Sequence, residues 1–345
     1  MTDVQAPGTS QQIQPPERVP AVSIRGVTVR STRRAHLRPV LSKVSLDVGP
    51  GEIVGLVGES GSGKTTLCRL VAGLLQDGMR LTDGTITLDG RDITALPPTA
   101  LHRLRPHGVS MVFQDPLAAL NPVIKVGDQV AEAFGPRASR RGPGVRQTVV
   151  DLLHQMGLAN ADSRLAAYPA ELSGGQRQRV VLAMALATDP TLILADEPTS
   201  SLDVRTQAQI LDLFANVASA RKVAILLVSH DFGVIAEICD RVCVMYGGQI
   251  VESGPTAHIL SHPAHPYTAR LIESLPSVNK RVQKLSVIPG RPPALEEQLP
   301  GCSFFPRCTM GQEEPCTSAP MELVPIAPGH TTACIIEISH GPSTP

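Results

Sequence analysis

A glycine-rich run at residues 58–65 (Gly-Glu-Ser-Gly-Ser-Gly-Lys-Thr) constrains the fold of this chain more than any other feature, because it fits the pattern G-x-x-x-x-G-K-[ST]. An almost continuous apolar segment, residues 52–57, precedes the run, and a segment of helical character, residues 65–75, follows it. Between a strand and a helix, such glycines let backbone N–H groups turn inward towards phosphate oxygens, and the helix N-terminus adds its positive dipole end. Lys64 is expected to neutralise the β- and γ-phosphates, and Thr65 to offer its hydroxyl to Mg²⁺. The run therefore predicts a nucleotide site, and its expected binding residues are Gly58, Glu59, Ser60, Gly61, Ser62, Gly63, Lys64, Thr65 and Thr66.

Two carboxylates follow a strand-length apolar segment at residues 192–195. Asp196 is placed to hold Mg²⁺, and Glu197 to polarise an attacking water molecule as a general base. Paired acids after a strand belong more often to a solvated loop, but the phosphate loop upstream favours the catalytic interpretation.

The pattern of apolar segments predicts an α/β fold. Further strand-length runs at residues 109–113 and 223–228 are joined by segments long enough to hold helices, which indicates a mixed, largely parallel sheet. Residues 22–24 and 44–48 alternate in polarity, as half-buried strands do. Between about residues 115 and 172 we expect a helical insertion, in which one helix face carries Val149, Leu152, Leu153 and Met156.

Length and composition bound the organisation of the chain. Its 345 residues suggest two or three folding units, and its balance of 31 basic against 31 acidic residues gives no long-range attraction to nucleic acid. No apolar run approaches 18 residues, and the N-terminus lacks a signal-peptide layout, so we expect a chain that stays in the cytosol and does not span a membrane by itself. The predicted division is a disordered tail (1–20), a nucleotide-binding domain (21–275) and a separate Pro-rich, then Cys-containing, C-terminal extension (276–345).

Four further motifs make the resemblance to a known family specific. Residues 172–179 (Leu-Ser-Gly-Gly-Gln-Arg-Gln-Arg) resemble the signature sequence of ATP-binding-cassette (ABC) proteins. Gln114 resembles the Q-loop glutamine, Asp203 belongs to a segment similar to the D-loop, and His230 resembles the switch histidine. Together with the phosphate loop, their order and spacing match the family over about residues 20–275.

The resemblance implies a P-loop NTPase of the ABC cassette fold, with a helical subdomain at about 115–172. It also implies ATP and Mg²⁺ as ligands, with Gln114 sensing Mg²⁺ and the γ-phosphate, and His230 holding the γ-phosphate and water near Glu197. In such proteins two cassettes dimerise head to tail, and the signature of one completes the nucleotide site of the other. The residues that this arrangement assigns to the partner's nucleotide are Ser173, Gly174, Gly175 and Gln176, with Asp203 nearby.

Other segments resemble the oligopeptide/dipeptide importer branch of the family. They are residues 115–122, 168–172 and 265–268, and a C-terminal stretch from 300 to 334. The resemblance implies an ATPase that powers import from the cytoplasmic face of the inner membrane as a peripheral subunit. Its partners would be a second cassette (identical or related), two membrane-spanning permeases and an extracytoplasmic substrate-binding protein.

Two alternatives remain open at the level of sequence. The same transporter class carries metal chelates, opines or glutathione-like peptides, and the ATPase sequence does not distinguish these cargoes from plain peptides. A soluble ABC protein acting on ribosomes or DNA is disfavoured, because the chain has one cassette, no basic run and an importer-like extension.

Four cysteines lie close together in the C-terminal extension: Cys302, Cys308, Cys316 and Cys334. Their gaps of five, seven and seventeen residues do not form the short C-x₂-C knuckle of a zinc finger. Four thiolates still suit a tetrahedral site for zinc or an iron–sulfur cluster, and the resemblance favours a [4Fe–4S] cluster; incidental cysteines are the alternative. Cys68, Cys239 and Cys243 lie in apolar patterns and are predicted to be small core residues.

The sequence departs from the family where adenine is held. Alignment of residues 22–29 with the family's first strand puts Arg30 or Ser31 where many members stack an aromatic ring on the base, and no aromatic residue precedes Phe113. We therefore expect adenine to pack against Arg30, His36 or aliphatic stems, with weaker base selectivity, so that GTP is partly accepted. Strict ATP preference in a nucleotide competition assay would refute this expectation.

Overall fold

The computed structural model describes residues 19–34, 37–97, 100–101, 107–135, 143–274, 288–297 and 299–336. Its strands are β1 (Val22–Ser31), β2 (Leu41–Val48), β3 (Ile53–Val57), β4 (Met79–Leu88), β5 (Arg91–Asp92), β6 (Val109–Val112), β7 (Leu192–Asp196), β8 (Ala224–Ser229), β9 (Arg241–Tyr246), β10 (Gln249–Pro255), β11 (Val324–Ala327) and β12 (His330–Thr332). Its helices are α1 (Lys64–Val71), α3 (Pro116–Ala119), α4 (Val126–Ala133), α5 (Pro143–Gln155), α6 (Ala161–Arg164), α7 (Gly174–Leu186), α8 (Val204–Arg221), α9 (Phe232–Ile238), α10 (Thr256–Ser261), α11 (Pro266–Glu273) and α12 (Glu313–Cys316), with 3₁₀ turns η1 (Pro169–Glu171) and η2 (Phe305–Arg307).

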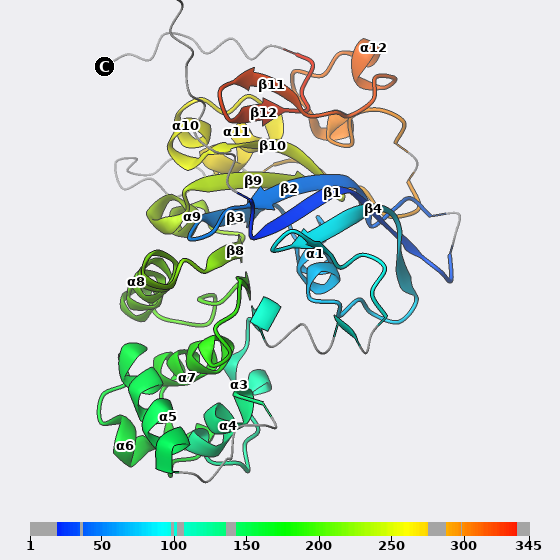
Figure 1. Cartoon of the computed structure of the whole chain (residues 1–345). Helices are drawn as coiled ribbons and strands as arrows, with labels where there is room; N and C mark the ends of the chain where they lie inside the picture. The colour runs from blue at the N-terminus through cyan, green and yellow to red at the C-terminus, as the bar shows by residue number, and fades with distance from the viewer. Residues whose placement is uncertain are drawn as a thin grey trace, which may run out of the picture.

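The central sheet has eight strands in the order β11-β12-β10-β9-β3-β8-β7-β6. The five strands from β9 to β6 are mutually parallel, whereas β10, β12 and β11 join in antiparallel pairs (Figure 1). Every residue of β3 and of β8 is buried, as expected for strands covered on both faces. The predicted strands at residues 52–57, 109–113, 192–195 and 223–228 are confirmed as β3, β6, β7 and β8, and so is the mixed, largely parallel sheet.

A second, antiparallel sheet runs in the order β2-β1-β4-β5. The alternation at residues 22–24 and 44–48 correctly predicted β1 and β2, whose inward side chains are buried. The sequence analysis did not find β4, which pairs with β1 at Ile24 and Ile86. Most of β4 is partly or fully exposed, so it lacks a long apolar signal.

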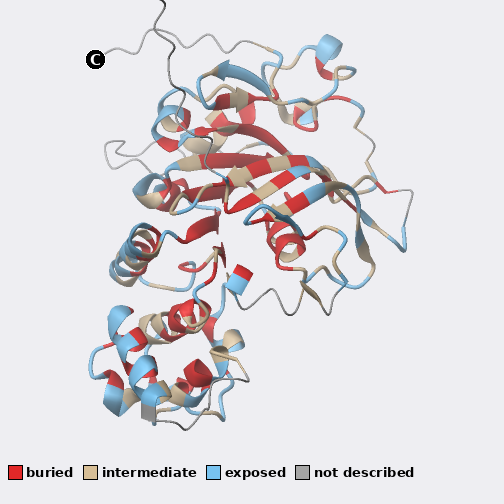
Figure 2. Ribbon diagram, viewed as in Figure 1, coloured by how far each residue is buried: buried red, intermediate tan, exposed pale blue. Residues whose placement is uncertain are grey.

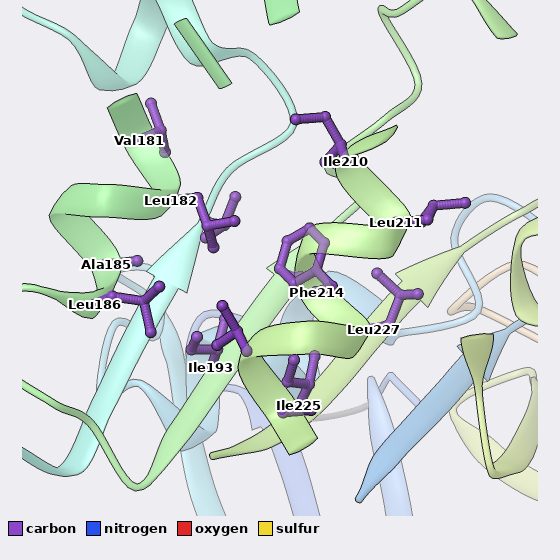
Figure 3. Close-up of a cluster of buried hydrophobic side chains, with 14 of the residues drawn as sticks. Val181, Leu182, Ala185, Leu186, Ile193, Ile210, Leu211, Phe214, Ile225 and Leu227 are labelled. Carbon is purple, nitrogen blue, oxygen red and sulfur yellow. The ribbon is translucent and has the colours of Figure 1, made fainter. Parts of the chain in front are cut away.

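Helices α3 to α7 form a lobe at the end of the molecule opposite the C-terminal strands (Figure 1). The predicted face of α5 is confirmed, because Val149, Leu152, Leu153 and Met156 are all buried. Helices α7 and α8 connect this lobe to the sheet through a cluster with β7 and β8, in which Phe214 lies near Leu182 and Ile225 (Figure 3). The buried positions run from the lobe into the strands, while the outer helix faces are exposed (Figure 2).

The C-terminal segment, of which residues 288–297 and 299–336 are described, packs on the nucleotide-binding part of the chain rather than standing apart from it. Strand β12 pairs with β10, at Thr332 opposite Glu252, and Phe304 is buried in the same core cluster as the parallel strands. Aromatic and strand contacts therefore join the two parts. The boundary at 276 lies outside the described residues and stays a prediction, as does the disordered tail, of which the structure describes only residues 19 and 20.

Three of the cysteines are core residues, as predicted. Cys68, Cys239 and Cys243 are buried in α1, after α9 and in β9, and burial raises the pKa of each thiol. In the described part of the chain, no helix combines the length and the apolar character that crossing a membrane requires.

Candidate functional site

The glycine-rich run forms the loop between β3 and α1, as its sequence predicts. Gly58, Gly61 and Gly63 all have positive φ, at 152°, 80° and 106°. A Cβ atom on Gly58 would collide with the carbonyl oxygen of Met245, and one on Gly63 would lie 2.8 Å from Leu41. Only glycine permits both the left-handed backbone and the close packing of this loop on its neighbours.

Lys64 is the first residue of α1 and folds back over the loop. Its Nζ donates to the carbonyl oxygens of Gly58, at 2.7 Å, and Glu59, at 3.0 Å. Burial lowers the pKa of Lys64, while the carboxylates of Glu197 and Asp196 act in the opposite direction. A phosphate group at the loop would offer this partly desolvated ammonium a stronger partner than two carbonyl oxygens.

The first acid of the predicted pair lies beside the loop threonine. Thr65 Oγ1 donates to Asp196 Oδ1 at 3.3 Å, which joins α1 to the end of β7. Burial is the largest cause that raises the pKa of Asp196, and the neighbouring Glu197 raises it further. A hydroxyl and a carboxylate oxygen this close are the ligand types that Mg²⁺ prefers, so the pair fits a magnesium site next to the phosphates.

The second acid lies where three sequence motifs meet. Glu197 Oε2 accepts a hydrogen bond from Gln114 Nε2 at 3.1 Å and lies 3.3 Å from His230 Nδ1. Glu197 also has a left-handed backbone, with φ of 49°, and its N–H donates to Val228 O at 3.1 Å. Left-handed backbone is rare for a glutamate and recurs at functional sites, where the surrounding structure maintains it.

Residues of the phosphate loop, together with Gln114, Glu197 and His230, line one cavity of about 720 Å³. The volume lies in the range of small-molecule sites. The lining residues are Arg38, Val40, Ser60, Gly61, Gly63, Lys64, Thr65, Thr66, Gln114, Glu197, His230, Gly248, Pro293, Ala294 and Leu295. The folded chain thus brings together the phosphate loop, the Q-loop glutamine, the second acid and the switch histidine, which are dispersed over residues 58–230.

The signature lies elsewhere. Ser173 caps α7 through a capping box, in which its Oγ accepts from Gln176 N at 3.3 Å and its N–H donates to Gln176 Oε1 at 3.0 Å. Asp203 caps α8 in a similar way, accepting from Thr206 N at 3.0 Å. Among the described residues that line the cavity, none belongs to 173–176 or is Asp203, and Ser173 and Gly174 are exposed.

Several lining residues escaped the sequence analysis. Arg38 and Val40 come from the segment between β1 and β2, and residues 293–295 come from the C-terminal segment. Arg30, which was expected to contact adenine, is not among the described lining residues; its guanidinium instead donates to Leu37 O at 3.4 Å. His36, the other expected contact, lies outside the described residues; Val40 and Leu295 are aliphatic residues of the cavity lining.

A strong ion pair, also missed, connects the phosphate loop to the C-terminal segment. Both carboxylate oxygens of Glu59 accept from Arg307, at 2.6 and 2.9 Å. Hydrogen bonds to Glu59 and Tyr246 raise the pKa of Arg307. No motif signals such a contact, because the two residues lie 248 positions apart.

The four C-terminal cysteines are free thiols. Cys302 N–H donates to Cys316 O at 2.7 Å, and burial raises the pKa of Cys302 to about 11, with further increases from the thiols of Cys308, Cys334 and Cys316. Within the described ranges, however, no three His, Cys, Asp or Glu side chains are arranged to hold a metal ion, so the predicted ligand set is not preformed.

Comparison with known proteins agrees with the motifs. Residues 41–200 match the model of the ABC transporter family, and residues 251–316 match that of the oligopeptide/dipeptide transporter C-terminal region. The oligopeptide transport ATP-binding protein AppD of Bacillus subtilis is 39% identical over 90% of this chain and 94% of its own length. The oligopeptide transport ATP-binding protein OppD of Mycobacterium tuberculosis is 43% identical over 85% of this chain and 48% of its own length.

A solved structure supports the fold. The ATP-binding cassette MJ0796, solved as a dimer in a post-hydrolysis state with ADP and Pi, superimposes with a TM-score of 0.60 at 28% identity, over 68% of this chain and 98% of its own. The ABC cassette fold inferred from the motifs is therefore confirmed. With a full-length relative at 39% identity and two matching family models, the chain belongs to the ABC ATPases, in the branch of the oligopeptide/dipeptide transport ATP-binding proteins.

Proposed function

We propose that this chain hydrolyses ATP to drive the import of oligopeptides or dipeptides through a membrane transporter. The observation that carries the proposal is one cavity that joins the phosphate loop to Glu197, Gln114 and His230. The match of residues 251–316 to the oligopeptide/dipeptide transporter C-terminal region supports the cargo class.

The phosphate loop positions the triphosphate. Inward N–H groups between Gly58 and Thr65 receive the phosphate oxygens, and Lys64 exchanges its contacts with Gly58 O and Glu59 O for the β- and γ-phosphates. Thr65 and Asp196, with Gln114, supply the oxygen atoms that would hold Mg²⁺, which neutralises phosphate charge when bound.

Glu197 polarises the water molecule that attacks the γ-phosphate. Its carboxylate is positioned by the Gln114 amide and by its left-handed backbone, so the oxygen that accepts the water proton is held at the cavity wall. His230 lies beside this oxygen and is placed to hold the γ-phosphate during attack.

We further propose that two cassettes close head to tail around two nucleotides. The exposed position of Ser173 and Gly174, away from the cavity of their own chain, supports this arrangement, because the start of α7 is then free to meet the partner's γ-phosphate. The partners proposed are a second cassette, two membrane-spanning permeases and an extracytoplasmic substrate-binding protein, with this chain as a peripheral subunit at the cytoplasmic face of the inner membrane. The predicted division into 1–20, 21–275 and 276–345 belongs to the same proposal.

Uptake by cells tests the transport role. A strain without this gene is expected to lose uptake of labelled oligopeptides, and the wild-type gene is expected to restore it. Lys64→Ala should fail to restore uptake because the triphosphate loses its main cation, whereas Lys125→Ala, which removes an exposed lysine far from the phosphate loop in sequence, should succeed. Unchanged peptide uptake with loss of chelated-metal, opine or glutathione uptake would replace peptides with one of those cargoes.

For the four C-terminal cysteines we propose a [4Fe–4S] cluster, with zinc as the alternative. The proposal rests on the donor set: Cys302, Cys308, Cys316 and Cys334 are all free thiols, and four thiolates suit an iron–sulfur or zinc site. A bound metal would favour the thiolate form of these cysteines, since a coordinated thiol is deprotonated.

Anaerobically purified protein tests this site directly. An iron–sulfur cluster is expected to give a brown colour with absorbance near about 400 nm and stoichiometric iron and sulfide. Cys302→Ser should abolish that absorbance, and Cys68→Ser, at a buried cysteine of α1, should preserve it in the folded fraction. Stoichiometric zinc without the absorbance would favour the zinc site, and metal-free protein would leave four incidental cysteines.

A further inference from the structure

The wall of the nucleotide cavity contains two segments that no motif assigns. Arg38 and Val40 lie between β1 and β2, and residues 293–295 belong to the C-terminal segment. They line the same cavity as the phosphate loop, together with Gly248, which follows β9. A nucleotide whose phosphates occupy the loop must place its base somewhere in this remaining part of the cavity.

Arg38 is held in place by backbone carbonyl groups. Its Nε donates to Ala294 O at 2.9 Å, Nη1 to Gly247 O at 2.7 Å and Nη2 to Pro293 O at 2.8 Å. The Arg38 backbone N–H also donates to Leu295 O at 3.0 Å. Arg38 thus fastens the C-terminal segment to the start of the chain, across 255 positions.

The geometry of this anchor leaves a flat cationic surface available. All N–H donors of a guanidinium lie in its plane, so the three carbonyl groups occupy the edge of Arg38 and not its faces. Guanidinium faces stack on aromatic rings and on nucleobases. Arg38 therefore offers what an aromatic residue offers in other cassettes, in a chain whose first 112 residues contain no aromatic side chain.

We propose that Arg38 and residues 293–295 form the base subsite of this ATPase. The purine stacks on the guanidinium face of Arg38 and packs against Pro293 and Leu295 of the C-terminal segment. This inference rests on the proposed binding of the triphosphate at the phosphate loop. It adds that the C-terminal segment takes part in nucleotide binding, although this segment lies outside residues 41–200, which match the ABC transporter family. Stacking does not contact the hydrogen-bonding groups at the edges of a base, by which adenine and guanine differ. The subsite therefore accepts both purines.

Binding of ATP, GTP and inorganic tripolyphosphate to the full chain tests the subsite. Arg38→Ala is expected to weaken ATP and GTP binding by about 10- to 100-fold, the effect of removing one stacking partner from a base. Tripolyphosphate has no base, so its affinity should not change. Leu295→Ala leaves the Arg38 anchor intact and should weaken ATP by a smaller factor, again without effect on tripolyphosphate. Arg25→Ala, which removes an exposed arginine of β1, is the matched control.

Each other outcome overturns the inference. Equal weakening of ATP and tripolyphosphate by Arg38→Ala would mean that the substitution disturbs the whole cavity rather than a base subsite. Unchanged or tighter ATP binding would mean that residues 293–295 do not contact the base, or that they obstruct it. Lys64→Ala separates this inference from the proposed function, because it should weaken ATP and tripolyphosphate together. If Lys64→Ala has no effect, the phosphate loop is not the triphosphate site and the proposed function itself fails.

Discussion

Glu197→Gln should bind ATP and lose at least about 100-fold in turnover, the low end of a general-base contribution. The amide keeps the size of the carboxylate and can still contact Gln114 and His230, but it cannot accept the proton of the attacking water. Steady-state phosphate release and ATP binding, measured on the same preparation, separate the two effects. Glu237→Gln on α9, an exposed glutamate outside the cavity, is the matched control and should keep normal turnover. Near-normal turnover in Glu197→Gln would remove Glu197 from the catalytic role.

The same variant should trap the closed dimer. If hydrolysis opens the head-to-tail pair, Glu197→Gln with ATP should sediment as a dimer, and without ATP as a monomer. Adding Ser173→Arg should abolish the dimer, because the larger arginine side chain at the N-terminus of α7 would occupy the space that the partner's γ-phosphate needs. Ser163→Arg, at an exposed serine of α6 in the same lobe, should leave the dimer intact. An ATP-dependent dimer that survives Ser173→Arg would place the interface elsewhere.

The sequence predicted local features of the site well. The phosphate loop, the two acids at the end of β7 and the buried face of α5 each depend on residues close together in the chain, where glycine geometry and apolar periodicity leave a direct trace. Contacts between distant segments left no such trace. Arg38 reaches residues 293 and 294 through carbonyl groups, which every residue has, so no residue type marks the partner positions.

Strand β4 and the exposed signature residue Ser173 show two further limits of sequence reasoning. β4 is paired with β1, but most of its residues are partly or fully exposed, so its position depends on register and not on an apolar run. The exposure of Ser173 follows from the fold of one chain, and its role depends on a second chain. Family resemblance supplied that role, and neither periodicity nor spacing did.

The ion pair between Glu59 and Arg307 should contribute more to stability than any surface pair of the same chemistry. The Arg307 side chain is 6% exposed and that of Glu59 is 24% exposed. Arg307 also donates to Tyr246 Oη, at 3.2 Å, and to Pro289 O, at 2.8 Å. Arg307→Ala leaves a largely buried carboxylate without its cation, and removing one partner of a buried pair costs about 3–5 kcal/mol. Urea unfolding of the full chain should show a decrease near the lower bound, since Glu59 keeps some contact with water.

The chain offers a matched comparison for this effect. Arg25 and Asp47 form a similar two-point pair, with Nη2 and Oδ2 2.7 Å apart, but their side chains are 54% and 38% exposed. Arg25→Ala should therefore lower the free energy of unfolding by about 1 kcal/mol or less, because water screens the pair.

A double-mutant cycle of Arg307→Ala with Glu59→Gln isolates the pair itself from the other Arg307 contacts. A coupling energy no larger than that of the Arg25–Asp47 pair would show that the C-terminal segment is held by its aromatic and strand contacts instead. A large coupling, with weaker binding of ATP and tripolyphosphate alike, would show that Arg307 fixes the phosphate loop through Glu59. The C-terminal segment would then act on the triphosphate from one side and on the base from the other.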